Sequence, residues 1–232
     1  MNLADRTIIV CQSVRRLHIK DVRIGKNMKQ LLEKLNYYRN FPRFQLERHF
    51  DVILIDYIPQ IINYFNHTNY SVVFPEFPVR KKLLIPNNKS ERESVAFDYA
   101  LFDKINKRIG IVELKTETES NDKIQDDYLS KLMVSVSCKD LIKFVRERKE
   151  YKKGDRKTRK YEFLYKEMYE NECVNFFKDS EELILTYKIS PHNLKLNNSS
   201  YYSFEKIANE VQISDKNWPL LCEYLKKWNK GL

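Results

Sequence analysis

Glycine is scarce in this chain, and the few glycines stand far apart. Only four glycines and seven prolines occur among 232 residues. The sequence therefore contains no Gly/Ser-rich or Pro-rich linker and no low-complexity segment. It also lacks the Gly-rich loop that cradles nucleotide phosphates, and it shows no internal repeat. These absences exclude a repeat protein and a phosphate-loop enzyme.

Cysteine and histidine are also sparse, and neither forms close pairs along the chain. The residues of these two types are Cys11, Cys138, Cys173, Cys222, His18, His49, His67 and His192. Zinc sites need such residues at short spacings, so a zinc enzyme has no support here. A Cys/His nucleophile has no support either, and we expect the thiols to be reduced.

Long apolar runs are missing. No run reaches the length that spans a bilayer, and the N-terminus lacks the apolar core of a signal peptide. We therefore expect a cytoplasmic protein with no membrane partner. A hydrophobic content of 42% and an aromatic content of 13% predict a folded chain rather than a disordered one.

Positive charge is in excess. The formal net charge is +10 and the pI is about 9.2. Residues 1–44 hold ten Lys/Arg against three acids, and residues 146–160 hold nine against three. This balance favours a polyanionic partner, nucleic acid before an anionic membrane surface. Each run is also compatible with a simple solvated helix face.

Hydrophobic spacing predicts a mixed α/β protein with helices on both faces of the sheet. Three consecutive strands, a crossover helix and a fourth strand give this arrangement. Pro59 should kink or split its helix, and two prolines place the first long strand near a sheet edge. Strands are expected at 7–11, 70–79, 94–102, 109–114 and 183–189, and helices at 26–38, 44–65, 123–145, 161–177, 203–213 and 216–229.

The two central strands carry three ionisable residues that we expect to converge. Side chains alternate along a strand, so Glu113 and Lys115 point the same way. Asp98 can stand beside them if the strands pair as a hairpin. Two carboxylates would supply oxygen ligands for Mg²⁺, and the ammonium would orient a water or offset charge on a phosphate. The alternative is an ordinary hairpin with these residues on a solvated face.

The order of elements, with Asp98 on the second strand and Glu113-Leu114-Lys115 on the third, resembles the PD-(D/E)XK nuclease superfamily. The resemblance spans about residues 44–190. It implies a restriction-endonuclease-like αβββαβ core with a helical basic insertion. In this interpretation, a nuclease domain at 44–232 follows an N-terminal basic extension at 1–43.

The resemblance implies catalysis that depends on Mg²⁺ or Mn²⁺, with Asp98, Glu113, Lys115 and Gln125 as catalytic residues. Gln125 resembles the glutamine of a helix motif in exonuclease-type members, but it also fits a helix capping box. Glu47 and Glu76 stand where some members have an extra acid, although each has an alternative role as an ordinary surface charge. The metal ligands would be Asp98, Glu113, the carbonyl of Leu114, Glu47 and Glu76.

The resemblance favours DNA as the substrate and an endonuclease over an exonuclease. We expect basic residues of the insertion to contact phosphates without reading sequence. These residues are Arg146, Arg148, Lys149, Lys152, Lys153, Arg156 and Lys157. A non-catalytic nucleic-acid-binding protein, or a complex subunit on the same scaffold, is the alternative, and a homodimer stays open.

Overall fold

The structure is a computed structural model, and it describes residues 9–10, 24–41, 45–87, 93–116, 123–150, 155–191 and 200–229. The described strands form one mixed sheet in the order β1-β2-β3-β4-β5-β6. The pairs β2–β3 and β3–β4 are antiparallel. The pairs β1–β2, β4–β5 and β5–β6 are parallel. The strands are β1 (Ile9–Val10), β2 (Val72–Arg80), β3 (Ser94–Asp103), β4 (Arg108–Leu114), β5 (Leu185–Ser190) and β6 (Ser200–Ser203).

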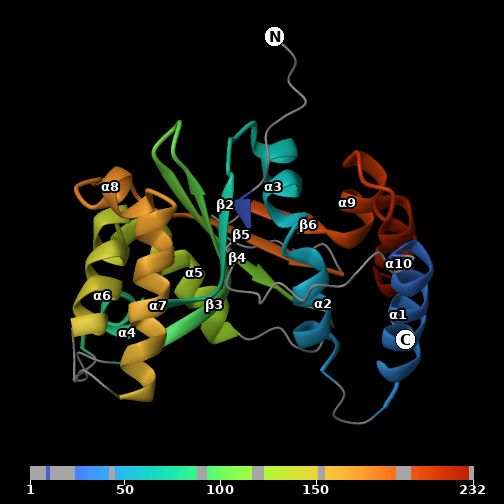
Figure 1. Cartoon of the computed structure of the whole chain (residues 1–232), viewed down its shortest axis with the longest axis horizontal. Helices are drawn as coiled ribbons and strands as arrows, with labels where there is room; N and C mark the ends of the chain where they lie inside the picture. Colours follow the sequence, from blue (N-terminus) through green and yellow to red (C-terminus); the bar gives the residue numbers. More distant parts are fainter. Residues whose placement is uncertain are drawn as a thin grey trace.

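Helices cover both faces of the sheet (Figure 1). One face is covered by α1 (Ile24–Tyr38), α2 (Leu46–Leu54), α3 (Ile58–Asn66), α9 (Phe204–Glu210) and α10 (Trp218–Asn229). The other is covered by α4 (Lys81–Leu84), α5 (Lys123–Ser135), α6 (Cys138–Glu150), α7 (Arg156–Glu170) and α8 (Cys173–Phe177). The predicted mixed α/β architecture is confirmed.

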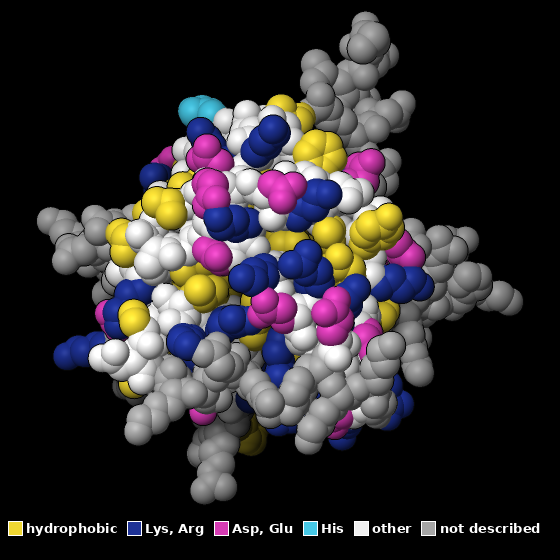
Figure 2. Space-filling model, turned by 90° about the vertical axis from the view of Figure 1, so that its left-hand side faces the viewer, with side chains coloured by type: hydrophobic (Ala, Val, Ile, Leu, Met, Phe, Trp, Pro, Cys, Tyr) yellow, Lys and Arg dark blue, Asp and Glu magenta, His cyan; other side chains and the backbone are white. Residues whose placement is uncertain are grey.

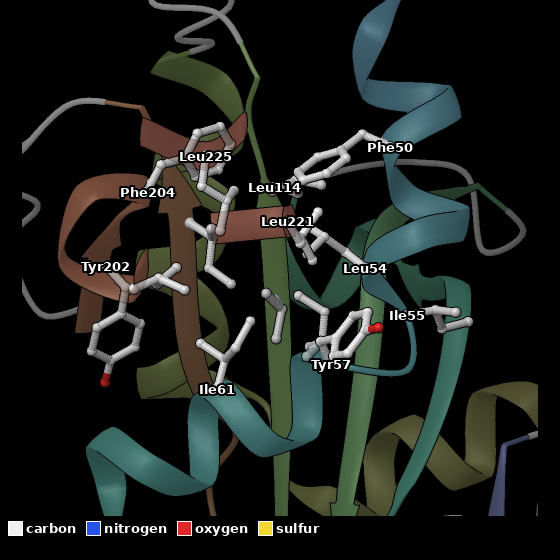
Figure 3. Close-up of a cluster of buried hydrophobic side chains, with 14 of the residues drawn as sticks. Phe50, Leu54, Ile55, Tyr57, Ile61, Leu114, Tyr202, Phe204, Leu221 and Leu225 are labelled. Carbon is white, nitrogen blue, oxygen red and sulfur yellow. The ribbon is translucent and has the colours of Figure 1, made fainter. Parts of the chain in front are cut away.

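Each face of the sheet has its own hydrophobic core. On β4, Val112 and Leu114 belong to the core under α2 and α3, while Ile109 and Ile111 belong to the core under α5 and α6. Figure 3 shows Leu114 among buried side chains that include Phe50 of α2. Burial on both faces explains why the central strands have nearly continuous apolar sequences. It also fixes the strands that carry the ionisable residues.

Most predicted helices and strands are present, and the helix that Pro59 was expected to kink or split is indeed split. The helix expected over 44–65 is split into α2 and α3 by a turn at 55–57, and Pro59 lies in the first turn of α3. Proline is tolerated there because a first-turn N–H has no partner within the helix. Strand β6 was not predicted.

Two predicted helices have wrong boundaries. The helix expected over 123–145 is two helices, because Ser137 leaves the helical pattern and pairs with Leu183. The Ser137 hydroxyl donates to Asp140 Oδ2 at 2.7 Å, and α6 begins at the next residue, Cys138. The helix expected over 161–177 instead begins at Arg156 and ends at Glu170. Glu172 follows with a φ of 63°, in the left-handed region, and α8 is a separate helix.

The alternation of side chains along the β2–β3 ribbon changes at Glu76 and Asp98, the two positions that the register skips between its pairs Pro75–Tyr99 and Phe77–Phe97. Phe74 before this point and Phe77 after it belong to the same core, although strict alternation would send them to opposite faces. Glu76 has a φ of 50°. This left-handed conformation costs a residue other than glycine about 1 kcal/mol or more.

Helix α1 packs into the same core as α2 and α3. Leu32 and Leu35 belong to that core, and Trp228 Nε1 of α10 donates to Asn36 Oδ1 at 2.9 Å. The division of the chain at residue 43 stays a prediction. Within the part of the chain that the structure describes, no helix has both the length and the apolar character needed to cross a membrane.

Gly110 on β4 occupies a position where two tyrosines leave no room for a side chain. A Cβ there would lie 2.7 Å from Tyr187 Cε2 and 2.9 Å from the Tyr70 hydroxyl. The two hydroxyls lie 3.1 Å apart in a buried hydrogen bond. We expect Gly110→Ala to lower the free energy of unfolding by about 1–3 kcal/mol, because overpacking forces the tyrosines to move. Urea unfolding followed by circular dichroism measures the change.

The control for this measurement is Ile105→Ala, in the turn between β3 and β4. Ile105 is 66% exposed. Its truncation should change the free energy of unfolding by less than about 0.5 kcal/mol. A Gly110→Ala protein as stable as this control would contradict the close approach of the tyrosines.

Candidate active site

The candidate site begins where β3 and β4 separate. Their register ends at Tyr99 and Val112, although β3 remains paired with β2, and β4 with β5, beyond this point. Backbone groups at such a separation need other partners. The Leu114 N–H donates to Asp98 Oδ2 at 2.6 Å. A side chain thus replaces a strand partner and holds the Asp98 carboxylate at the end of β4.

Glu113 and Lys115 form a buried ion pair at the same place. Lys115 Nζ lies 2.8 Å from Glu113 Oε1 and 3.5 Å from Glu47 Oε1 on α2. The side chains of Glu113 and Lys115 are 1% and 6% exposed. Neither Glu113 oxygen accepts a hydrogen bond of normal geometry from the described residues. The structure therefore brings Glu113, Lys115 and Asp98 together, as the sequence predicted, and adds Glu47 to them.

Helix α2 contributes a second acid that the sequence analysis missed. Asp51 follows Glu47 by one turn of α2. The Tyr99 hydroxyl donates to the backbone oxygen of Asp51 at 3.0 Å and lies 3.3 Å from Asp51 Oδ1. This contact holds the acidic side of α2 against β3. The available signal was the i,i+4 spacing of two acids on an amphipathic helix.

Burial and mutual repulsion raise the pKa values of three carboxyls. Burial, followed by the charge of Asp98, raises the pKa of Glu113 to about 8. Burial, followed by the charges of Asp98 and Glu47, raises the pKa of Asp51 to about 7. Burial raises the pKa of Asp98 to about 6, against the opposing effects of the Leu114 N–H and Lys115. The cluster thus carries more negative charge than its surroundings compensate.

Lys115 is the cation within this cluster. Burial disfavours its ammonium, but the nearby carboxylates, Glu113 first, outweigh that effect and raise its pKa. Lys115 therefore stays protonated at neutral pH. It can donate hydrogen bonds and neutralise charge, but it cannot act as a base there.

The donor set fits a divalent cation, although the ligands are not yet grouped around one. Among the described residues, no three His, Cys, Asp or Glu side chains are arranged to hold a metal as they stand. Mg²⁺ usually takes only one or two carboxylates and completes its shell with waters and substrate phosphates. Asp98 and Glu113 meet that need. The incompletely balanced charge of buried Glu113 and the raised carboxyl pKa values both favour an added positive charge.

The other predicted metal ligands lie at different depths. Glu47 is half-buried in the first turn of α2, and Glu76 is exposed on β2. The charge of Glu76 nevertheless raises the pKa of Asp98. Leu114 has its side chain in a hydrophobic core and its N–H on Asp98.

Gln125 is half-buried on α5. The next residue, Asp126, makes the contact that joins α5 to β5. Lys188 Nζ of β5 donates to Asp126 Oδ1 at 2.6 Å, and the Lys188 side chain is 1% exposed. The β4–β5 register pairs Lys188 directly with Glu113. Lys188 was not among the predicted site residues, although a lone lysine within the apolar run LILTYKI was a signal. Asp122, which would begin the capping box, lies outside the described residues.

Part of the predicted basic surface packs α6 against α7. The Arg148 guanidinium lies 5.1 Å from the Tyr161 ring centre, and Lys149 Nζ lies 3.5 Å from that of Tyr165. Cation–π contacts of this kind stabilise the helix pair. These two residues therefore have a structural role in addition to any contact with phosphate.

The remaining basic residues are exposed or lie outside the described residues. Arg146 is exposed on α6, and Arg156 and Lys157 are exposed at the start of α7. Lys152 and Lys153 fall outside the described residues. Figure 2 shows that Lys and Arg side chains on this face are interleaved with Asp and Glu. The start of α7 is thus the clearest candidate for a phosphate contact.

In the metal-free protein, we expect the free energy of unfolding to fall between about pH 5 and pH 8. Unfolded Glu113 releases its proton near its ordinary pKa of 4.5, but folded Glu113 releases it near 8. In this window only the folded state keeps the proton, so stability decreases as the pH rises. Glu113→Gln removes the share of this loss that Glu113 causes, while Asp51 and Asp98 keep theirs. The stability of the variant relative to wild type should therefore rise by about 1–3 kcal/mol from pH 5 to pH 8. Urea unfolding in EDTA at both pH values measures it.

Glu172→Gln is the control for this pH dependence. Glu172 is an exposed acid, and its pKa is lowered by Lys104, so its titration lies below the window. This variant should keep the wild-type decrease between pH 5 and pH 8. If Glu113→Gln and Glu172→Gln give parallel profiles, Glu113 does not hold a proton in this range.

A scan against protein-family models found no match to this chain, and searches of the curated proteins and of the solved structures found none either. The chemistry of the site therefore has to be inferred from the residues that form it.

Proposed function

We propose that this chain is a metal-dependent nuclease that hydrolyses phosphodiester bonds, with DNA as the favoured substrate. One observation carries the proposal: a buried Glu113 carboxylate lies 2.8 Å from Lys115, beside Asp98, where β3 and β4 separate. Buried carboxylates whose charge is not fully balanced are costly, and groups with such perturbed pKa values gather at functional sites. An ordinary amphipathic hairpin has no need of them.

The order and pairing of the elements support the same proposal. A helix, three antiparallel strands, a helix and a strand parallel to the third match the αβββαβ core of the PD-(D/E)XK superfamily. We infer that the fold is restriction-endonuclease-like and that Asp98 and Glu113-Leu114-Lys115 are its motif. We propose that the chain cleaves within a strand, as an endonuclease, rather than from a strand end, as an exonuclease.

Each residue of the cluster has a distinct role in the proposed reaction. Mg²⁺ or Mn²⁺, held by Asp98 and Glu113 with Glu47 nearby, would supply positive charge to the phosphate in the transition state. Lys115 donates a hydrogen bond that orients the attacking water or stabilises a phosphate oxygen. Asp51 adds to the negative potential that attracts the cation.

We expect Asp98→Asn, Glu113→Gln and Lys115→Met each to reduce Mg²⁺-dependent cleavage at least about a hundredfold, because the first two weaken the hold on the metal and the third removes the ammonium that acts on the water or the phosphate. The assay incubates linear, closed circular and single-stranded DNA, and RNA, with Mg²⁺ or Mn²⁺. Cutting of closed circles identifies an endonuclease. Circular dichroism verifies that the variants fold.

Asp127→Asn is the matched control. Asp127 is an exposed acid on α5 that pairs with Lys131, and it belongs to no part of the cluster. This variant should cleave at the wild-type rate. Full activity of purified Asp98→Asn would refute the proposed site.

A non-catalytic nucleic-acid-binding protein is the second candidate function. The observation that favours it is that the described residues contain no ready group of three metal-ligating side chains. Calorimetric titration with Mn²⁺ separates the two candidates. Binding that is lost in Glu113→Gln supports the nuclease, and the absence of binding in wild type supports the inert binder.

We expect the double variant Arg156→Gln, Lys157→Gln to bind DNA less tightly and with weaker salt dependence. Each phosphate contact contributes about 0.9 to the slope of log affinity against log salt for duplex DNA and about 0.7 for a single strand. The slope should therefore fall by about one to two. Fluorescence anisotropy in EDTA over a range of salt concentrations measures it.

Lys166→Gln provides the control for the salt experiment. Lys166 lies on the same helix but 3.6 Å from Glu170, so its charge is already paired. Its substitution should leave the slope unchanged. If the double variant has the wild-type slope, the start of α7 does not contact phosphates.

A further inference from the structure

A cleft of about 380 Å³ lies between α7 and the β2–β3 ribbon. Its walls are largely apolar, with Phe74 and Pro75 on β2 and with Tyr161 and Phe163 on α7. The Tyr161 hydroxyl lies 3.2 Å from Ser94 Oγ and links the two walls. Phe163 is 46% exposed, so part of an aromatic ring is open to a ligand.

The cleft borders the acidic cluster at Glu76, whose charge acts on Asp98. Glu76 lines the cleft, and it stands on β2 between Pro75 and Phe77, whose partners Tyr99 and Phe97 flank Asp98 on β3. Ala96 also lines the cleft, and it stands two residues before Asp98 on β3. A ligand in the cleft would therefore lie beside the phosphate that the cluster is proposed to cleave.

The chemistry of the cleft suits a nucleobase. Bases of any sequence stack on aromatic side chains, and such contacts are common in single-strand binding sites. Lys160 lines the cleft, and Arg156 and Lys157 are exposed at the start of the same helix, where they can meet the sugar–phosphate backbone. The volume is that of a small-molecule site, about 300–1,000 Å³. A base could enter only after leaving its partner.

We infer that this cleft takes one unpaired nucleobase of the strand whose phosphate lies at Asp98 and Glu113. The inference rests on the proposed nuclease function and narrows its substrate to single-stranded nucleic acid, or to a duplex with a flipped-out nucleotide. Tyr161 and Phe163 provide the stacking surfaces, and Ala96 leaves room for the base.

The test uses the full chain and short single-stranded DNA oligonucleotides in EDTA, where no cleavage occurs. One oligonucleotide is intact, and the others carry a single abasic position that is moved along the strand. For wild type, an abasic site at one position should weaken binding about tenfold, because one stacked base is lost. Fluorescence anisotropy measures the affinities.

Ala96→Phe fills the cleft from an exposed strand position. It should bind the intact oligonucleotide about tenfold more weakly than wild type and lose the dependence on the abasic position. Phe163→Ala removes a stacking surface without adding volume and should show the same loss. Ile105→Phe adds the same ring to an exposed turn at the other end of the β3–β4 hairpin, and should bind as wild type does.

Cleavage by the same preparations, measured in Mn²⁺, separates this inference from the proposed function. Equal binding at every abasic position, with both cleft variants like wild type, overturns the inference even if DNA is cleaved. Position-dependent binding that both variants lose supports it even if no cleavage occurs. Binding of a proline-rich peptide that Ala96→Phe abolishes, without any effect of this variant on oligonucleotide binding, also overturns it.

Discussion

The hydrogen bond from the Leu114 N–H to the Asp98 carboxylate is the contact on which the arrangement of the site depends. It substitutes for strand pairing at the place where β3 leaves β4, and so allows the two strands to diverge without an unsatisfied backbone group. Divergence leaves space at the end of β4 for Glu113 and Lys115.

Burial of apolar side chains in the two hydrophobic cores offsets the cost of burying this cluster of charges. Glu113 is buried although its neighbours do not fully balance its charge. Leu114, the next residue, packs into the opposite core with Phe50 and Leu54 (Figure 3). Along β4, therefore, the burial of Leu114 favours folding and the burial of the adjacent Glu113 opposes it. The favourable burial of the apolar neighbours offsets the unfavourable desolvation of the Glu113 carboxylate.

Sequence reasoning found the parts of the site that follow from short-range patterns. Strand alternation placed Glu113 and Lys115 on one side, and hairpin pairing brought Asp98 to them. Asp51 and Lys188 were missed because their roles depend on where a helix and a distant strand dock. The break between α5 and α6 was missed for a related reason: it is stabilised by contacts of Ser137 with Leu183, far along the chain. Helical periodicity alone does not record such contacts.

The left-handed backbone at Glu76 constrains how this surface can vary. Asparagine and aspartate tolerate that conformation, and glycine adopts it freely, whereas a β-branched residue there would strain the chain. Substitutions at this position therefore act on two properties at once, the electric charge beside Asp98 and the geometry of the ribbon. Replacement of Glu76 by glycine or asparagine would remove the charge beside Asp98 and keep the geometry of the ribbon. In a set of diverged relatives, this one site would show whether selection maintains the acid or only the bend.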